Sequence, residues 1–128
     1  MINSGVIADT CIWIEFFKTD SPIANKLEEL IKQQDVFMVG IILSELLQGM
    51  RNEKQKTIVL ESISILPYLE INKAYWIKTG TLSAQLRQKG ITIPLSDITI
   101  AVIAMENNCQ VFTTDPHFKQ IPGVRLYK

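Results

Sequence analysis

Four acidic residues occupy positions where a negative charge needs a partner: Asp9, Glu45, Asp97 and Asp115. Asp9 and Asp115 each come just after a short apolar run of the kind that forms a buried strand. Glu45 lies inside an apolar segment, and Asp97 directly precedes another. A carboxylate in such surroundings is expected to be neutral, paired with a cation or bound to a metal ion.

Each of these acidic residues also has an ordinary structural explanation. Asp9 can cap the helix that follows it, and Asp97 suits the positive end of a helix dipole. Asp115 precedes Pro116, and Asp-Pro pairs commonly begin a turn. Glu45 can face solvent from the polar side of a helix. These explanations serve each residue singly, but they leave the shared placement at strand ends and helix starts unexplained.

Strands and helices are predicted to alternate along the chain. Short apolar runs predict strands at residues 6–8, 36–39 and 111–113, with a further short strand at 124–127. The spacing of apolar residues and the signals at helix ends predict six helices. They cover residues 10–17, a segment that begins at 22 and continues beyond 31, and residues 41–50, 52–64, 72 to about 90, and 97–107. This alternation indicates an α/β domain with a mainly parallel sheet.

Local signals mark the ends of several of these helices. Ser21 is expected to cap a helix whose first position is Pro22. Asn72 and Ser96 are expected to cap two later helices, and Gly90 is a plausible stop for the first of those two.

The predicted topology brings the four carboxylates together. In a parallel α/β layer, the carboxyl ends of the strands and the starts of the following helices lie at one edge of the sheet, where functional groups collect. Four negative charges there would repel one another strongly in a pocket of low dielectric constant. A hard divalent cation, Mg²⁺ or Mn²⁺, removes that repulsion and prefers oxygen ligands. Such a site is typical of phosphate ester chemistry.

Length and composition predict one folded unit, residues 1–128. Hydrophobic residues make up 47% of the chain and charged residues 20%, which excludes a disordered protein. Thirteen Lys and Arg balance thirteen Asp and Glu, so a general polycation for nucleic acid is disfavoured. Nucleic acid remains possible as a substrate where basic residues cluster locally.

The sequence also indicates the cellular setting. Cys11 and Cys109 form no CxxC pattern, which disfavours a disulfide framework or zinc site, and both are expected to be small buried hydrophobes. No basic segment precedes the first apolar stretch, and the longest apolar run is far short of a membrane span. We therefore expect a cytoplasmic protein without a membrane partner.

Four short motifs, taken in order, resemble those of PIN-domain ribonucleases. They are Asp9-Thr10, Glu45-Leu46-Leu47-Gln48-Gly49, Ser96-Asp97-x-x-Ile100-Ala101 and Thr113-x-Asp115-x-His117-Phe118. The compact size and the Glu-Leu-Leu-Gln-Gly stretch are most similar to VapC-type toxins of bacterial toxin–antitoxin pairs. The resemblance spans essentially the whole chain, and the set of motifs is more specific than any one of them.

The resemblance implies a three-layer PIN-like fold and an endoribonuclease that depends on Mg²⁺ or Mn²⁺. It implies that the four acidic residues hold one or two ions, with Glu45 as a ligand or as the base toward the attacking water. Thr10 and Thr113 resemble polar neighbours of the metal or its water. The products would carry a 5′-phosphate and a 3′-hydroxyl, and the expected partners are RNA, a cognate antitoxin protein and a second copy of the chain.

His117 departs from one common form of the last motif, in which another acidic residue precedes the Phe. It is expected to be a turn residue outside the metal's ligands, with a ligand or proton carrier as the alternative. Two rival functions also stay open. Another Mg²⁺-dependent phosphohydrolase would favour a Gly-rich phosphate loop, which is not visible. A catalytically silent PIN-like module that grips RNA or protein would not need all four acids.

Overall fold

The computed structural model describes residues 5–18 and 20–128. Its helices and strands, in chain order, are β1 (Gly5–Ala8), α1 (Thr10–Lys18), α2 (Pro22–Lys32), β2 (Val36–Val39), α3 (Gly40–Gln48), α4 (Glu53–Ile63), β3 (Tyr68–Leu69), α5 (Lys73–Gln88), α6 (Leu95–Glu106), β4 (Cys109–Phe112) and the 3₁₀ helix η1 (Pro116–Gln120). None of the described helices is long and apolar enough to cross a membrane.

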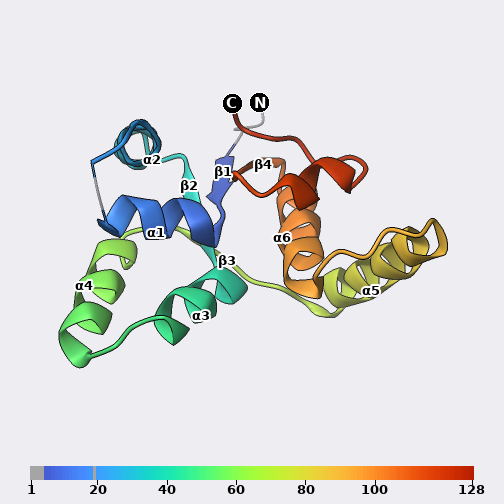
Figure 1. Ribbon diagram of the computed structural model, residues 1–128, viewed down its shortest axis with the longest axis horizontal. Helices are drawn as coiled ribbons and strands as arrows, with labels where there is room; N and C mark the ends of the chain where they lie inside the picture. The colour runs from blue at the N-terminus through green and yellow to red at the C-terminus, as the bar shows by residue number, and fades with distance from the viewer. Residues whose placement is uncertain (1–4, 19) are drawn as a thin grey trace.

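The strands form one four-stranded sheet in the order β3-β2-β1-β4, and every neighbouring pair is parallel. Helices α1 to α4 gather on one side of the strands and α5 and α6 on the other (Figure 1). This arrangement confirms the predicted α/β fold with a parallel sheet flanked by helices. Parallel strands require crossover connections, and two helices separate each pair of successive strands.

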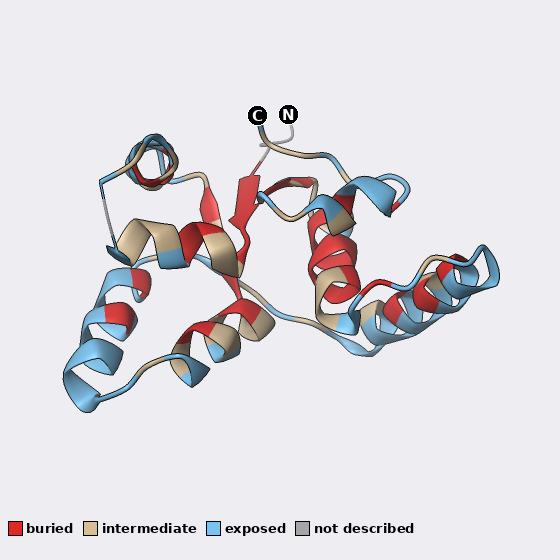
Figure 2. Ribbon diagram, viewed as in Figure 1, coloured by how far each residue is buried: buried red, intermediate tan, exposed pale blue. Residues whose placement is uncertain are grey.

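The core lies along the central strands and α6. All four residues of β1 are buried, and so are the seven residues of α6 from Ile98 to Ala104. Figure 2 shows this concentration of buried residues on the strands and α6, while α4 and α5 expose much of their outer surfaces. A helix that is apolar all round is stable only when buried, so α6 is held firmly beside the sheet.

Several predicted end signals are confirmed. The Ser21 side chain accepts a hydrogen bond from the backbone N–H of Ala24 at 3.1 Å, and Asn72 accepts one from Tyr75 at 2.9 Å. Gly90 follows the end of α5 with a φ of +80°, a left-handed conformation that glycine adopts without a steric penalty.

Three details of the prediction are wrong. Ser96 does not cap α6, because the carbonyl of Pro94 already accepts hydrogen bonds from Asp97 and Ile98 and the helix begins at Leu95. Strand β3 is missing from the prediction because its two residues carry no periodicity. The strand expected at 124–127 is reduced to a single parallel bridge between Val111 and Leu126.

Candidate active site

Asp9 stands at the carboxyl end of β1, next to the end of β4. Because Ala8 pairs with Phe112, the residues that follow them, Asp9 and Thr113, leave the sheet side by side. Asp9 is buried, with 6% of the residue exposed, and the Thr113 hydroxyl donates a hydrogen bond to its Oδ2 atom at 2.8 Å. The backbone N–H of Thr10 donates to Oδ1 at 2.8 Å. The sheet register and these hydrogen bonds therefore fix the orientation of this carboxylate.

Glu45 reaches the same edge from α3. The hydroxyl of Thr10, the first residue of α1, donates to Glu45 Oε1 at 2.6 Å. Residues 10 and 45 are adjacent in space because β1 and β2 are neighbouring parallel strands, and α1 and α3 begin where these strands end. Thr10, which the resemblance implies is a polar neighbour of the metal or its water, thus lies beside the acidic side chain of Glu45.

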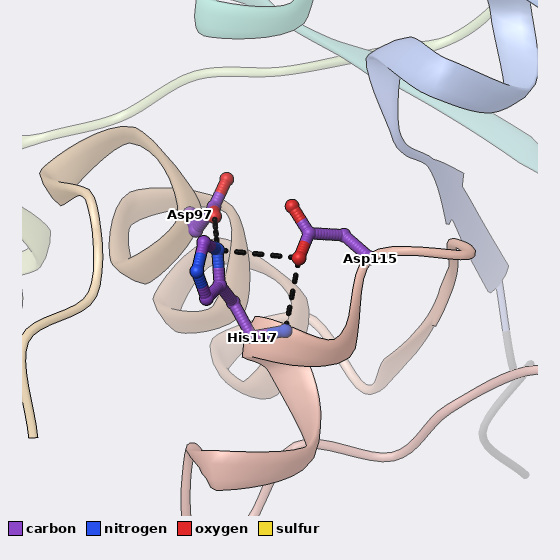
Figure 3. Close-up of side chains that lie close together, drawn as sticks. All are labelled: Asp97, Asp115 and His117. Atoms are coloured by element: carbon purple, nitrogen blue, oxygen red, sulfur yellow. Dashed lines mark hydrogen bonds and ion pairs between the residues drawn. The ribbon is translucent and has the colours of Figure 1, made fainter.

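Asp97 and Asp115 meet around the ring of His117. Asp97 lies in the first turn of α6, and Asp115 caps η1 by accepting a hydrogen bond from the backbone N–H of His117 at 2.9 Å. The His117 Nδ1 atom lies 3.2 Å from Asp97 Oδ2 and 3.2 Å from Asp115 Oδ1. Figure 3 shows the ring edge placed between the two carboxylates.

Thr113 links these two halves of the site. Its hydroxyl donates to Asp9 and accepts a hydrogen bond from the backbone N–H of Asp115 at 3.0 Å. The result is one continuous chain of polar contacts that runs from Glu45 to Asp97. All seven residues that the sequence singled out for the site belong to it: Asp9, Thr10, Glu45, Asp97, Thr113, Asp115 and His117.

Apart from the His117 ring, no basic side chain in the described part of the chain pairs with the carboxylates at this edge. Within residues 5–18 and 20–128, no Lys or Arg forms an ion pair with Asp9, Glu45, Asp97 or Asp115. Burial raises the pKa of Asp97 above its ordinary value, and the nearby carboxylates of Asp9 and Asp115 raise it further, against the opposing hydrogen bond from His117. A group whose ionised form is disfavoured by its neighbours gains from an added cation.

A cluster suited to a metal ion is present among these residues. One ligand atom each from Asp97, Asp115 and His117 lies within 4.8 Å of the others, and all three side chains are partly open to solvent. The set is rich in carboxylate oxygen, which suits Mg²⁺ and Mn²⁺. It also contains an imidazole nitrogen, which the sequence prediction placed outside the ligands.

Cys11 is a neighbour of the site that the sequence prediction missed. It is half-buried, and its Sγ lies 3.7 Å from Asp9 Oδ2 and 3.4 Å from the Thr114 hydroxyl. The expectation of a simple buried hydrophobe is wrong here because the first turn of α1 directs the thiol toward Asp9, whereas Cys109 is buried as expected. The position of Cys11 two residues after Asp9 was the sequence feature that could have indicated a thiol near the site.

Comparison with known proteins identifies the family. A family model for the PIN domain matches residues 6–124. The chain belongs to the PIN domain family. This PIN domain is 31% identical over 110 residues to Ribonuclease VapC2 of Rickettsia felis, covering 80% of each chain.

Solved structures agree with this assignment. A chain in the VapBC2 structure from Rickettsia felis, determined with a promoter DNA fragment, matches with a TM-score of 0.82 and 27% identity, covering 99% of this PIN domain and 98% of that chain. A chain in DNA-bound VapBC from Salmonella typhimurium matches with a TM-score of 0.82 and 26% identity, covering 98% of both chains. The resemblance to VapC-type toxins predicted from the motifs is confirmed.

Proposed function

We propose that this PIN domain is the endoribonuclease toxin of a cytoplasmic toxin–antitoxin pair and that it hydrolyses RNA phosphodiester bonds with Mg²⁺ or Mn²⁺. The observation that carries the proposal is the chain of contacts from Glu45 to Asp97, which gathers four carboxylates without a Lys or Arg partner in the described residues. The named relative from Rickettsia felis is a ribonuclease, which supports RNA as the substrate.

The acidic residues fit a divalent cation by charge and by donor type. Asp9, Asp97 and Asp115 would hold it, since burial and then the neighbouring carboxylates raise the pKa of Asp97, and a cation would favour its ionised form. When bound, the ion supplies a Lewis acid that orients the phosphate, activates a water molecule and stabilises the leaving oxygen. No covalent intermediate with the protein is required.

The remaining side chains position the carboxylates and handle protons. The Thr10 hydroxyl fixes Glu45 Oε1, so Glu45 is held as a ligand or as the base that takes a proton from the attacking water. The Thr113 hydroxyl fixes Asp9 Oδ2. The water oxygen forms a bond to phosphorus, the bond from phosphorus to the 3′-oxygen breaks, and a proton returns to that oxygen.

An antitoxin partner has a suitable surface next to the site. A cavity of about 450 Å³ opens between α1, α3 and α4, with Glu45 in its wall and apolar side chains that include Ile14, Phe17 and Leu46. Lys18 and Arg51 also line this cavity, so a peptide segment would match it with apolar side chains along most of its length and with one basic side chain only where it reaches Glu45. VapBC complexes among the solved relatives support an antitoxin partner. The homodimer implied by the resemblance stays a prediction.

RNA cleavage assays test this proposal. Purified protein incubated with total RNA is expected to cleave it with Mg²⁺ or Mn²⁺, to stop with a chelator and to resume when metal is restored. Asp9→Asn is expected to abolish cleavage while the fold, measured by circular dichroism, is retained. Equal cleavage by the variant and the parent would contradict the proposal. Hydrolysis of small phosphate esters without RNA cleavage would favour another phosphohydrolase, and RNA binding without cleavage a silent module.

A further inference from the structure

We infer that His117 is a nitrogen ligand of the metal site and that it makes the site prefer transition-metal ions such as Mn²⁺ over Mg²⁺. The inference rests on the proposed function, because it concerns the same acidic edge. It assigns to one side chain a role that the carboxylates do not have, namely selection among divalent ions.

Local sequence explains why the ring points into the site. Pro116 begins η1, and the Asp115 carboxylate caps this turn through the backbone N–H of His117. Phe118 is fully buried and anchors the turn in the core. With the backbone held at both neighbours, the ring of His117 is turned toward Asp97 in the first turn of α6 (Figure 3).

The distances around Nδ1 match those between neighbouring ligands of one ion. Two ligand atoms in adjacent positions of an octahedron, each about 2.1 Å from the ion, lie about 3 Å apart. Nδ1 lies 3.2 Å from Asp97 Oδ2 and 3.2 Å from Asp115 Oδ1. Both distances are within a few tenths of an ångström of that value, and the ligand atoms of Asp97 and Asp115 lie within 4.8 Å of each other, so the three donors are close enough to share one ion.

Access and chemistry agree with this role. The His117 side chain is 41% exposed and that of Asp115 is 33% exposed, so an ion can reach them from solvent. Imidazole nitrogen suits transition-metal ions, whereas Mg²⁺ prefers oxygen ligands and water. Replacing one oxygen ligand with this nitrogen therefore favours Mn²⁺ and the later transition metals.

The same contacts allow a second role, in which Nδ1–H only donates hydrogen bonds to both carboxylates and positions them. His117→Asn separates the two roles, because the Asn amide places an N–H donor near the position of Nδ1 but offers the metal no imidazole nitrogen. The chain is well suited to the test, since His117 is its only histidine.

The experiment uses Mn²⁺ bound to the full chain, prepared without a histidine tag and without RNA. Electron spin echo spectroscopy of the bound ion is expected to detect coupling to the ¹⁴N nucleus of an imidazole in the parent and none in His117→Asn. In calorimetric titrations, His117→Asn is expected to bind Mn²⁺ about tenfold more weakly than the parent or weaker still. Its affinity for Mg²⁺ is expected to change much less.

Mn²⁺ that binds the parent without ¹⁴N coupling would overturn this inference and leave the carboxylate site of the proposed function intact. Mn²⁺ binding that survives in both Asp97→Asn and Asp115→Asn would overturn the carboxylate site itself. An unchanged ratio of Mn²⁺ to Mg²⁺ affinity in His117→Asn would remove the selective role. Because the parent spectrum needs no substitution, the inference can fail even if the variants do not fold.

Discussion

Thr113 offers a sharp test of how the site is held together. Its hydroxyl donates to Asp9 Oδ2 at 2.8 Å and accepts the backbone N–H of Asp115 at 3.0 Å. Thr113→Val keeps the shape of the side chain and removes both hydrogen bonds. Asp9 and Asp115 then lose the contact that joins them, while all four carboxylates remain in the sequence.

The size of the effect follows from the strength of the contact to Asp9. A hydrogen bond to a charged group contributes about 1.5–3 kcal/mol. Since about 1.4 kcal/mol corresponds to a tenfold change in rate, kcat/KM for RNA cleavage by Thr113→Val should fall about 10- to 150-fold. Losses of similar size, about 10- to 100-fold, are usual when a partner of a metal ligand is removed.

The assay is cleavage of a fluorogenic RNA oligonucleotide over a range of Mg²⁺ concentrations. Thr113→Ser is the matched control, because it keeps the hydroxyl and should stay close to the parent. Thr114→Val is a surface control, since Thr114 is exposed and its hydroxyl contacts only the Cys11 sulfur among the hydrogen bonds found for it. A Thr113→Val protein as active as the parent would refute the reasoning, and so would a Thr113→Ser protein as impaired as Thr113→Val.

Three further predictions concern stability and metal. Because the pKa of Asp97 is raised in the fold, the native state keeps that proton to a higher pH than the unfolded chain, so this carboxyl lowers stability as pH rises from its unfolded value of 3.8. In the presence of a chelator, Asp97→Asn should therefore resist urea better than the parent at pH 7, but this advantage should be absent below pH 3.8. A difference in the free energy of unfolding that stays constant with pH would contradict this. Mg²⁺ at 100 times its Kd should stabilise the parent by about 2.7 kcal/mol in thermal melts, and a similar gain in Asp97→Asn would place the ion elsewhere. Thr79→Val should raise the free energy of unfolding by about 1 kcal/mol, because the buried Thr79 hydroxyl has no hydrogen-bond partner in the described part of the chain. Thr99→Val removes a hydrogen bond to the Leu95 carbonyl at 2.8 Å and should lower the free energy of unfolding. A Thr99→Val protein that is more stable to urea than Thr79→Val would contradict this prediction.

Features encoded by neighbouring residues were predictable from the sequence. The caps at Ser21 and Asn72 and the stop at Gly90 depend on a few consecutive residues, and the structure contains all three. Ser96 has the right chemistry for a cap, but Pro94 starts α6 earlier and places Ser96 inside the first turn. Strand β3 exists only because Tyr68 and Leu69 pair with β2, so no local pattern indicates it.

The site likewise has some features that the sequence predicts and others that depend on tertiary packing. The parallel topology explains why carboxylates from α3, from α6 and from the segments just after β1 and β4 meet, and this convergence was predictable once the alternation of strands and helices was recognised. The position of the His117 ring was not predictable, because it depends on how η1 packs against α6. The direction of the Cys11 thiol depends likewise on the first turn of α1.

Anomalous X-ray diffraction from crystals soaked in Mn²⁺ shows directly whether the carboxylates at this edge of the sheet hold a metal ion. We expect an anomalous peak between the carboxylates of Asp9, Asp97 and Asp115, which disappears in crystals of Asp97→Asn. Absence of a peak at this edge of the sheet under saturating Mn²⁺, or a peak bound elsewhere and unchanged in the variant, would contradict this expectation.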